Sequence, residues 1–490
     1  MKKHKTLWGT ILLLIVPLSL LSVGVWWALS ENASGLQPTG PAAWTTITLG
    51  DSARKAGDFW TDVDLDVSPR DPANPNDDTI YITATRWEGG NFILFLYVSQ
   101  DGGATWTKYR IKECQGFECY QARVGVAGFQ NADIVSVGWQ DLSPGNYDIL
   151  VQTFCVAQAT VGALPAGPSC PSGTPLTPDP VARPRDAYPA AATAPRVIPL
   201  TPEMVNVSKS STNSGNHDYG GREWTGSWDL SVSASCLTNN FPLVWAVWAE
   251  DYAEVRYSRS TNGVNWADPA ALPFESGLTR FPSAYSGPDG ALYAGTTTAS
   301  GNPDVFLTVS TDCGQTWGPV ANLSSNPGFS DAPQVAVTGD GKIHTVYDDT
   351  TVAAANSADN FYTQCTRTGN QLTCQPATRA VADGAFPHIA TDGKSLLMSY
   401  RAIPGGKNRG LGISCSPDSK PTWGAAYELT DPAGAILSAA SPTFTVPWGV
   451  HFLFIKGALA NQYGYVGWIQ VGPNFVRVQF SKGVRPGIGC

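Results

Sequence analysis

Charge is scarce in this sequence of 490 residues. Asp, Glu, Lys and Arg together make up 14%, against about 25% in an average soluble domain. The net charge is −9 and no basic stripe offsets it, so we expect no nucleic-acid partner. The five histidines are scattered and the cysteines form no Cys-x-x-Cys pair, so the ligand spacing of a zinc site is missing.

Turn-forming and aromatic residues are abundant instead. The chain has 50 glycines and 37 prolines, and 11% of its residues are aromatic. It is too apolar for a disordered chain and too rich in glycine and proline for a helical bundle. This composition predicts a large all-β protein with many short strands.

The N-terminus predicts export. Lys2, Lys3 and Lys5 precede a run from Thr6 to Ser30 without any charge, and about 20 apolar residues suffice to span a bilayer. Residues 1–30 are therefore either a cleaved signal peptide or an uncleaved signal-anchor helix that tethers the protein to the membrane. Both readings place the rest of the chain outside the cytoplasm, with residues 31–43 as a linker. No cysteine follows the run, which excludes a lipoprotein anchor.

Ten cysteines, an even number, fit an oxidising compartment. Three pairs are suggested by spacing: Cys114 with Cys119, Cys155 with Cys170, and Cys365 with Cys374. Cys236, Cys313, Cys415 and Cys490 remain without an assigned partner.

A short motif recurs along the chain. Residues 99–106 and 310–317 both read Ser-x-Asp-x-Gly-x-Thr-Trp, with a looser copy at 416–423 and a copy shorter by one residue at 260–266. The motif has the chemistry of a tight turn. Its Asp and Ser side chains bond backbone amides, its Gly takes a positive φ, and its Trp buries a large face.

A second repeat, a strand followed by a turn and a second strand, sets the period. One equivalent position in each copy gives Asp64, Arg123, Asp229, Ser283, Gln334, His388 and Thr443. A period of about 50 residues with four strands per unit indicates a β-propeller, and seven copies predict seven blades, over residues 44–484 with a tail at 485–490. The last blade is expected at 440–480, opening with a strand at 441–446, and residues 44–49 are expected to close the ring against it.

Residues 157–202, rich in Pro and Ala, are read as a loop or mobile insert between the third and fourth strands of blade two.

The seven equivalent positions are mostly polar, so they predict a polar wall around the propeller axis. Ligands of propellers bind at the channel mouth, where inner strands begin and second-to-third strand loops converge. Charged residues expected on loops at that face, and expected to be largely solvated, are Arg86, Glu88, Asp141, Glu250, Asp251, Asp348, Asp349, Arg401 and Lys456.

Two further segments are candidates for binding. Residues 216–224 pack His217, Tyr219, Arg222, Glu223 and Trp224 around a Gly-Gly pair, and such aromatic and charged groups suit sugar rings and hydroxyls. Asp62, Asp64 and Asp66 alternate, so they share one strand face. They are either solvated or bound to a structural Ca²⁺. The ligand-binding candidates are therefore Asp64, Arg123, His217, Tyr219, Arg222, Glu223, Trp224, Asp229, Glu250, His388 and Arg401.

The Ser-x-Asp-x-Gly-x-Thr-Trp element resembles the Asp box of the sialidase superfamily, also called the BNR repeat, over about residues 44–480. The resemblance implies a propeller, with the six blades of sialidases as an alternative to seven. It also implies a structural role for Ser99, Asp101, Gly103, Trp106, Trp266, Ser310, Asp312, Gly314, Trp317, Ser416, Asp418 and Trp423.

The resemblance also suggests catalytic residues. Sialidases use three arginines, a Tyr–Glu nucleophile pair and an acid. The matching regions offer Arg86, Glu88 and Arg409.

The sequence departs from that pattern at several places. No Arg-Ile-Pro motif opens the first blade, where Asp62-Val-Asp-Leu-Asp66 stands, and Ala439-Ala-Ser-Pro442 occupies the region of the Tyr nucleophile. Phe454-Ile-Lys456 occupies the region of its Glu partner. The leading hypothesis is therefore a non-catalytic exported propeller that binds a glycan or a protein and requires no cofactor. The alternatives are a sialidase-like glycoside hydrolase and an extracytoplasmic scaffold subunit.

Overall fold

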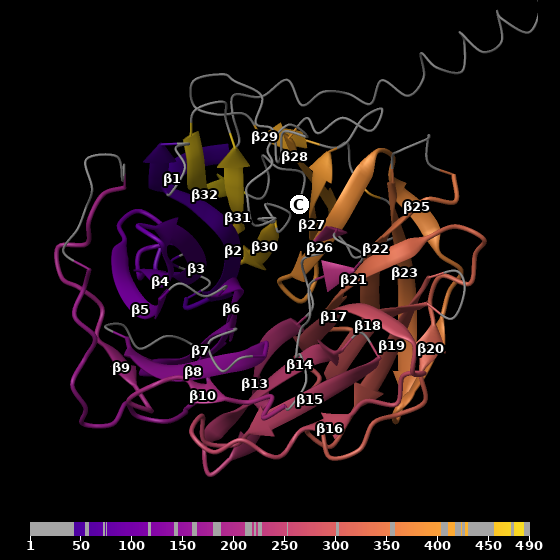
Figure 1. The fold of residues 1–490 in the computed structure, drawn as a ribbon, viewed down its shortest axis with the longest axis horizontal. Helices are drawn as coiled ribbons and strands as arrows, with labels where there is room; N and C mark the ends of the chain where they lie inside the picture. Colours follow the sequence, from indigo (N-terminus) through magenta and orange to yellow (C-terminus); the bar gives the residue numbers. More distant parts are fainter. Residues whose placement is uncertain are drawn as a thin grey trace, which may run out of the picture. The chain divides into compact units, whose positions relative to one another are not determined.

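The computed structural model describes residues 44–53, 58–71, 74, 76–115, 119–141, 146–158, 164–179, 188–210, 218–219, 222–223, 228–251, 253–299, 303–352, 358–402, 410–416, 423, 427–429, 455–471 and 475–484. The regular elements of this part of the chain are all β-strands, and Figure 1 shows them as successive antiparallel sheets. Among these residues, no helix combines the length and the apolar character that a membrane crossing needs. Residues 1–43, with the expected signal or anchor segment, lie outside the described residues.

The first three blades follow one another along the chain. Blade one consists of β2 (Asp58–Ser68), β3 (Thr79–Glu88), β4 (Asn91–Ser99) and β5 (Thr107–Gln115). Blade two consists of β6 (Cys119–Gly128), β7 (Ala132–Asp141), β8 (Asp148–Ala157), β9 (Val197–Pro199) and β10 (Val205–Asn206). A separate hairpin of β11 (Asp218–Tyr219) and β12 (Arg222–Glu223) precedes blade three, which consists of β13 (Trp228–Thr238), β14 (Phe241–Glu250), β15 (Glu254–Ser260) and β16 (Ala270–Ala271).

Four more blades complete the fold. Blade four consists of β17 (Leu278–Ser286), β18 (Leu292–Ala299), β19 (Asp304–Ser310) and β20 (Ala321–Asn322). Blade five consists of β21 (Ser330–Val337), β22 (Ile343–Asp349), β23 (Asp359–Thr368), β24 (Gln371–Cys374) and β25 (Thr378–Val381). Blade six consists of β26 (Gly384–Thr391), β27 (Leu396–Ala402), β28 (Gly410–Ser416) and β29 (Tyr427–Leu429). Blade seven consists of β30 (Lys456–Ala460), β31 (Tyr463–Val471), β32 (Phe475–Val484) and the N-terminal strand β1 (Trp44–Ala53).

The inner strands close into a ring. Each of β2, β6, β13, β17, β21 and β26 contacts the inner strand of the next blade, and β30 contacts both β26 and β2. β1 pairs antiparallel with β32, so the N-terminal strand completes the last blade, as the sequence predicts for residues 44–49. The fold is therefore a seven-bladed β-propeller. Among the described strands of blade seven, β30 at Lys456–Ala460 takes the inner place; the expected strand at 441–446, with Thr443, lies outside the described residues.

The core lies between the blades. One hydrophobic cluster joins blades one and two, with Leu94 and Tyr81 packed against Val124 and Val137, and equivalent clusters lie at the other six interfaces. Both faces of each sheet are therefore covered. This explains why strands such as β4 are continuous apolar runs rather than alternating ones.

The recurring motif forms turns between third and fourth strands. In blade one, Asp101 accepts hydrogen bonds from Ser99 Oγ at 2.8 Å, Thr105 N at 2.8 Å and Thr105 Oγ1 at 2.5 Å, while Ser99 Oγ accepts from Gly103 N. Gly103 has φ +90°, and a Cβ at this position would lie 2.5 Å from the Phe480 ring, so neither its backbone nor its surroundings accept a side chain. Trp106 is buried. The same contacts recur around Asp312 in blade four. Asp418 lies outside the described residues.

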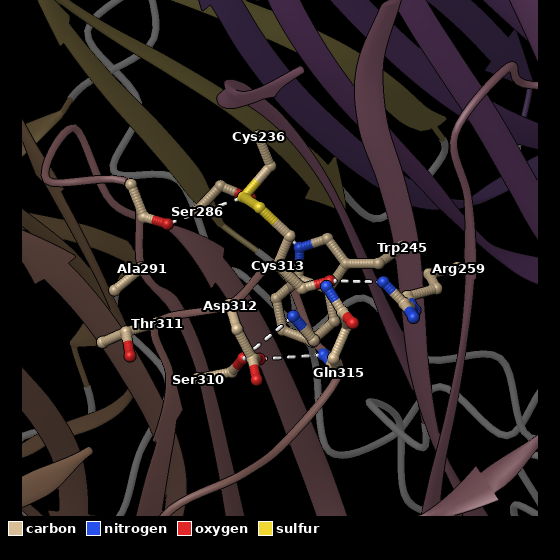
Figure 2. Close-up of a disulfide and its surroundings, with 12 residues drawn as sticks. Cys236, Trp245, Arg259, Ser286, Ala291, Ser310, Thr311, Asp312, Cys313 and Gln315 are labelled. Atoms are coloured by element: carbon tan, nitrogen blue, oxygen red, sulfur yellow. Dashed lines mark hydrogen bonds between the residues drawn. A yellow bond between two sulfur atoms is a disulfide. The ribbon is translucent and has the colours of Figure 1, made fainter. Parts of the chain in front are cut away.

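Disulfides link neighbouring segments. Cys114–Cys119, Cys155–Cys170 and Cys365–Cys374 are present, the three pairs that the spacing suggests. A fourth bond joins Cys236 of blade three to Cys313. Figure 2 shows that Cys313 belongs to the Asp312 turn of blade four, next to the Arg259 side chain that donates to its carbonyl at 2.8 Å. This bond therefore fastens two blades together.

The insert of blade two lies against blade one. Trp106 N donates to Pro189 O at 2.9 Å, and Asp179 N donates to Lys108 O at 2.8 Å. The ring of Tyr188 meets that of Tyr97 edge-on, 6.1 Å away. The described parts of the insert thus cover the outer edge of β5. Residues 164–179 are irregular, as the loop reading expects, whereas Val197–Pro199 form β9 and pair with β8. The edge strands offer these parts of the insert unpaired backbone groups.

Candidate functional site

Three of the equivalent inner positions bind the next blade through their side chains. Asp64 Oδ2 accepts from Val124 N at 2.9 Å, Asp229 Oδ2 accepts from Ala284 N at 3.0 Å, and His388 Nδ1 accepts from Gly457 N at 3.2 Å. Inner strands of neighbouring blades do not form a β-ladder, so their N–H groups need other acceptors. The polar wall is therefore part of what joins the blades.

The acidic face of β2 repeats this contact three times. Asp62 accepts from the backbone N–H groups of Gln121 and Ala122 at 2.7 and 3.0 Å, and Asp66 accepts from Val126 N at 2.8 Å. Asp62 and Asp64 are buried. Solvation is therefore wrong for these two, and a structural Ca²⁺ is unsupported, because the carboxylate oxygens already accept backbone N–H groups.

Opposite charges meet on the axis. Lys456 Nζ lies 3.8 Å from both Asp64 Oδ1 and Asp229 Oδ1, and Arg123 Nε lies 3.7 Å from Asp229. All four side chains are buried. The expectation that Lys456 sits on a solvated loop is wrong, because it begins the inner strand β30. Burial, together with the nearby Lys456 and Arg123, lowers the pKa of His388 well below 6.5, so this ring is neutral.

A bulge recurs where four inner strands begin. The register shifts just before Arg123, Ser283, Gln334 and His388. Within each shift lies a non-glycine residue with positive φ: Gln121 (57°), Phe281 (48°), Ala332 (53°) and Phe386 (50°). This backbone is strained for such residues, and a bulge changes the direction of the side chains next to it.

The rings of Phe281 and Phe386, from blades four and six, lie with their centres 5.9 Å apart. They therefore come together at the mouth although they belong to non-neighbouring blades.

Charged groups of blades four to six gather beside these rings; we call Arg280, Asp331, Asp348 and Arg401 the mouth cluster. Arg280 Nη2 lies 3.1 Å from Asp331 Oδ2, and its guanidinium lies over the Phe329 ring at 4.3 Å. Asp331 and Asp348 are cross-strand partners in blade five. Burial and then the neighbouring Asp331 raise the pKa of Asp348 well above its usual value. Burial lowers the pKa of Arg401 to about 10, against the effect of Asp348, so Arg401 stays charged at neutral pH.

Some of the buried polar atoms without a hydrogen-bond partner lie at this cluster, while others are spread over the described part of the fold. Within the described part of the chain, Asp348 Oδ1 has no hydrogen-bond partner, and neither end of the Asn360 amide has one. Asn360 pairs with Asp348 across the sheet and is fully buried. Buried polar atoms of this kind are rare in proteins and need an explanation.

Other residues that were expected at the mouth make contacts inside the fold. Arg86 is buried, lies 3.8 Å from Glu88, and stacks over the Trp60 ring at 5.2 Å. Glu250 accepts from Trp248 Nε1 at 2.7 Å and from Ser210 Oγ. Solvation is therefore wrong for Arg86 and Glu250, as it is for Asp141, Asp348 and Asp349, which are buried as well. Asp251 is exposed.

Three of the candidates, His217, Trp224 and Arg409, lie outside the described residues. Tyr219 and Arg222 pair across the β11–β12 hairpin, next to the pair of Asp218 and Glu223. The sequence reasoning missed Arg280 and Asp331. The sequence does contain a pattern that marks their positions. Arg280 directly precedes Phe281-Pro, and Asp331 directly precedes Ala332-Pro. These two pairs recur in the same register as Phe386-Pro, at the bulge.

Comparison with known proteins finds similar folds but no similar sequences. No family model matches the sequence, and no curated protein is similar to it in sequence. Three solved structures illustrate the likeness. A protein of unknown function from Dyadobacter fermentans is 11% identical, with a TM-score of 0.45, over 90% of this chain and 99% of its own. The Penicillium chrysogenum α-L-arabinanase complexed with arabinobiose is 11% identical, with a TM-score of 0.43, over 91% and 99%. The Trypanosoma rangeli sialidase is 11% identical, with a TM-score of 0.42, over 89% and 60%.

Proposed function

We propose that this protein is an exported or membrane-anchored propeller that binds a glycan at its mouth without transforming it. The observation that carries the proposal is the mouth cluster with its aromatic neighbours, Phe281, Phe329 and Phe386. Carboxyl, guanidinium and amide groups exchange hydrogen bonds with sugar hydroxyls, and aromatic faces receive the apolar face of a sugar ring. Four disulfides in the described residues support an extracytoplasmic location.

The positions of the arginines support binding rather than sialidase chemistry. Arg86 faces Glu88 on blade one, Arg123 faces Asp229 near the axis, and Arg280 faces Asp331 at blades four and five. Each belongs to a different blade and has its own acid. A carboxylate ligand would have to compete with these acids for the guanidinium groups. Lys456, a cation, begins the inner strand of blade seven and faces Asp64 and Asp229.

One observation favours the hydrolase alternative. Burial and the neighbouring Asp331 raise the pKa of Asp348 well above its usual value, and a glycosidase uses a carboxyl group with a raised pKa as its general acid. Turnover of a fluorogenic sialoside, lost on Arg86→Ala and on Arg409→Ala, would establish that alternative and contradict the binding proposal.

A glycan array with the purified protein tests the binding proposal. We expect hits that weaken at least tenfold in Asp348→Asn and in Arg401→Ala. Arg110→Ala is the matched control, since Arg110 is an exposed arginine on the outer strand β5, paired with Glu113; it should bind as the parent does. No hit, or equal binding by all four proteins, contradicts the proposal.

A further inference from the structure

One segment of the insert is unlike the other surface loops. Residues 164–179 have no regular strand pairing beyond a single bridge at Pro178. They contain five prolines: Pro165, Pro168, Pro171, Pro175 and Pro178. Proline fixes its own φ and pushes the residue before it towards an extended backbone. The segment is therefore an extended surface ribbon, which we call the proline ribbon.

Four hydroxyl groups stand out on the proline ribbon. Ser169, Ser172, Thr174 and Thr177 are all exposed. None of them hydrogen-bonds another residue that the structure describes. Hydroxyls in the turns behave differently. Ser99, Ser310 and Thr316, for example, are all bonded to turn carboxylates, so they are tied to the fold.

The proline ribbon is held in place at several points. The Cys155–Cys170 disulfide fixes its middle to β8. Leu176 N donates to Val197 O at 2.8 Å, and Lys108 Nζ lies 3.6 Å from Asp179. Anchors on both sides keep the backbone between them extended and the hydroxyls directed outward. Such a segment can enter an enzyme groove as it stands, with little ordering cost.

We propose that Ser169, Ser172, Thr174 and Thr177 are sites of O-glycosylation. Segments rich in Ser, Thr and Pro that need not form a core are typical acceptors of O-linked sugars. A bulky sugar is tolerated here because the side chains point to solvent. The inference rests on the extracytoplasmic location given under the proposed function, and it is independent of the mouth.

The transfer needs an activated sugar as its co-reactant. The donor is a hexose activated as a lipid-linked phosphate ester, used by a membrane transferase outside the cytoplasm. The Oγ or Oγ1 oxygen attacks the anomeric carbon, so a carbon–oxygen bond forms there. The bond from that carbon to the phosphate oxygen breaks, and the lipid phosphate leaves with the electron pair. The hydroxyl proton passes to the base of the transferase, and no oxidant or reductant is needed.

Intact-mass spectrometry on the full chain, purified from the cells that make it, is the test. We expect masses above the sequence mass by whole hexose units, with peptide mapping placing them on the proline ribbon. The variant S169A/S172A/T174A/T177A should lose all of the added mass. The variant T261A/S325A/T373A/T378A removes as many exposed hydroxyls elsewhere and should keep it.

Each other outcome overturns the inference in a distinguishable way. Unmodified protein recovered outside the cytoplasm shows that the proline ribbon is not glycosylated, while the location still holds. Unmodified protein recovered from the cytoplasm contradicts the location as well. Added mass that persists in the proline-ribbon variant places the sugars elsewhere. Circular dichroism of both variants verifies that the propeller is folded in each case.

Discussion

Asp64 on the inner strand of blade one accepts a hydrogen bond from the backbone N–H of Val124 on the inner strand of blade two, at 2.9 Å. Asp229 repeats the contact from blade three to Ala284 of blade four, and Lys456 of blade seven lies between the two carboxylates. A few axial side chains thus connect blades that are distant in the sequence.

Asp64→Ala should destabilise the propeller strongly. The change leaves Val124 N without this acceptor and removes one of the two carboxylates that face Lys456. Breaking a buried charge pair costs about 3–5 kcal/mol. Urea denaturation should show a loss of that size, while Glu113→Ala, at a surface pair, should cost about 0.2–1 kcal/mol. Equal effects of the two changes would contradict the role of Asp64.

His388 should make stability depend on pH. The pKa of His388 in the folded protein is well below 6.5. Below pH 6.5 the unfolded chain therefore binds a proton at this residue that the folded protein does not bind. The free energy of unfolding therefore falls as the pH drops through this window. Protonation would also remove the acceptor for Gly457 N. Denaturation at about pH 7.5 and about pH 5 should show the fall in the parent, and a smaller fall in His388→Gln. An identical pH dependence in both proteins would count against the assignment.

The Asp312 turn should depend on pH in a lower window. Burial acts to raise the pKa of Asp312, but hydrogen bonds from Thr316, Ser310 and Gln315 prevail and hold it at about 2. A depressed pKa gives stability that is present above 3.8 and is lost as the pH falls towards 2. Asp312→Asn should therefore lower the melting temperature at neutral pH and matter less near pH 2. A constant difference across the range would show that the ionised form is unimportant.

Two disulfides should differ in their contribution to stability. Cys236–Cys313 closes a separation of 77 residues and Cys365–Cys374 one of 9. From loop entropy alone, their removal should cost about 4.5 and about 2.6 kcal/mol. Paired Cys→Ser variants, compared by denaturation, should follow this order. The reverse order would mean that contacts in the folded state outweigh loop closure.

Much of the architecture is determined by the sequence alone. The repeat of about 50 residues and the recurring turns predict seven blades, because each blade needs the same strands and the same tight turns. The inner positions, including Asp64, Asp229 and His388, follow from that register. Residues 44–49 also read as an outer strand that closes the ring, and β1 does so.

Only the tertiary structure decided what the polar residues do. The sequence shows that Asp62, Asp64 and Asp66 share a face, but not that the N–H groups of the next blade lie opposite them. It also cannot bring Arg280 and Asp331, or Phe281 and Phe386, together, because these contacts cross blades whose separation in space is set by closing the ring. The inner strand of blade seven, β30, is set by the ring for a related reason. This strand begins with Lys456, a cation, at a position where the other blades carry mostly acids or neutral polar groups. The cation has a role only in the closed ring, because the acids of blades one and three face it there.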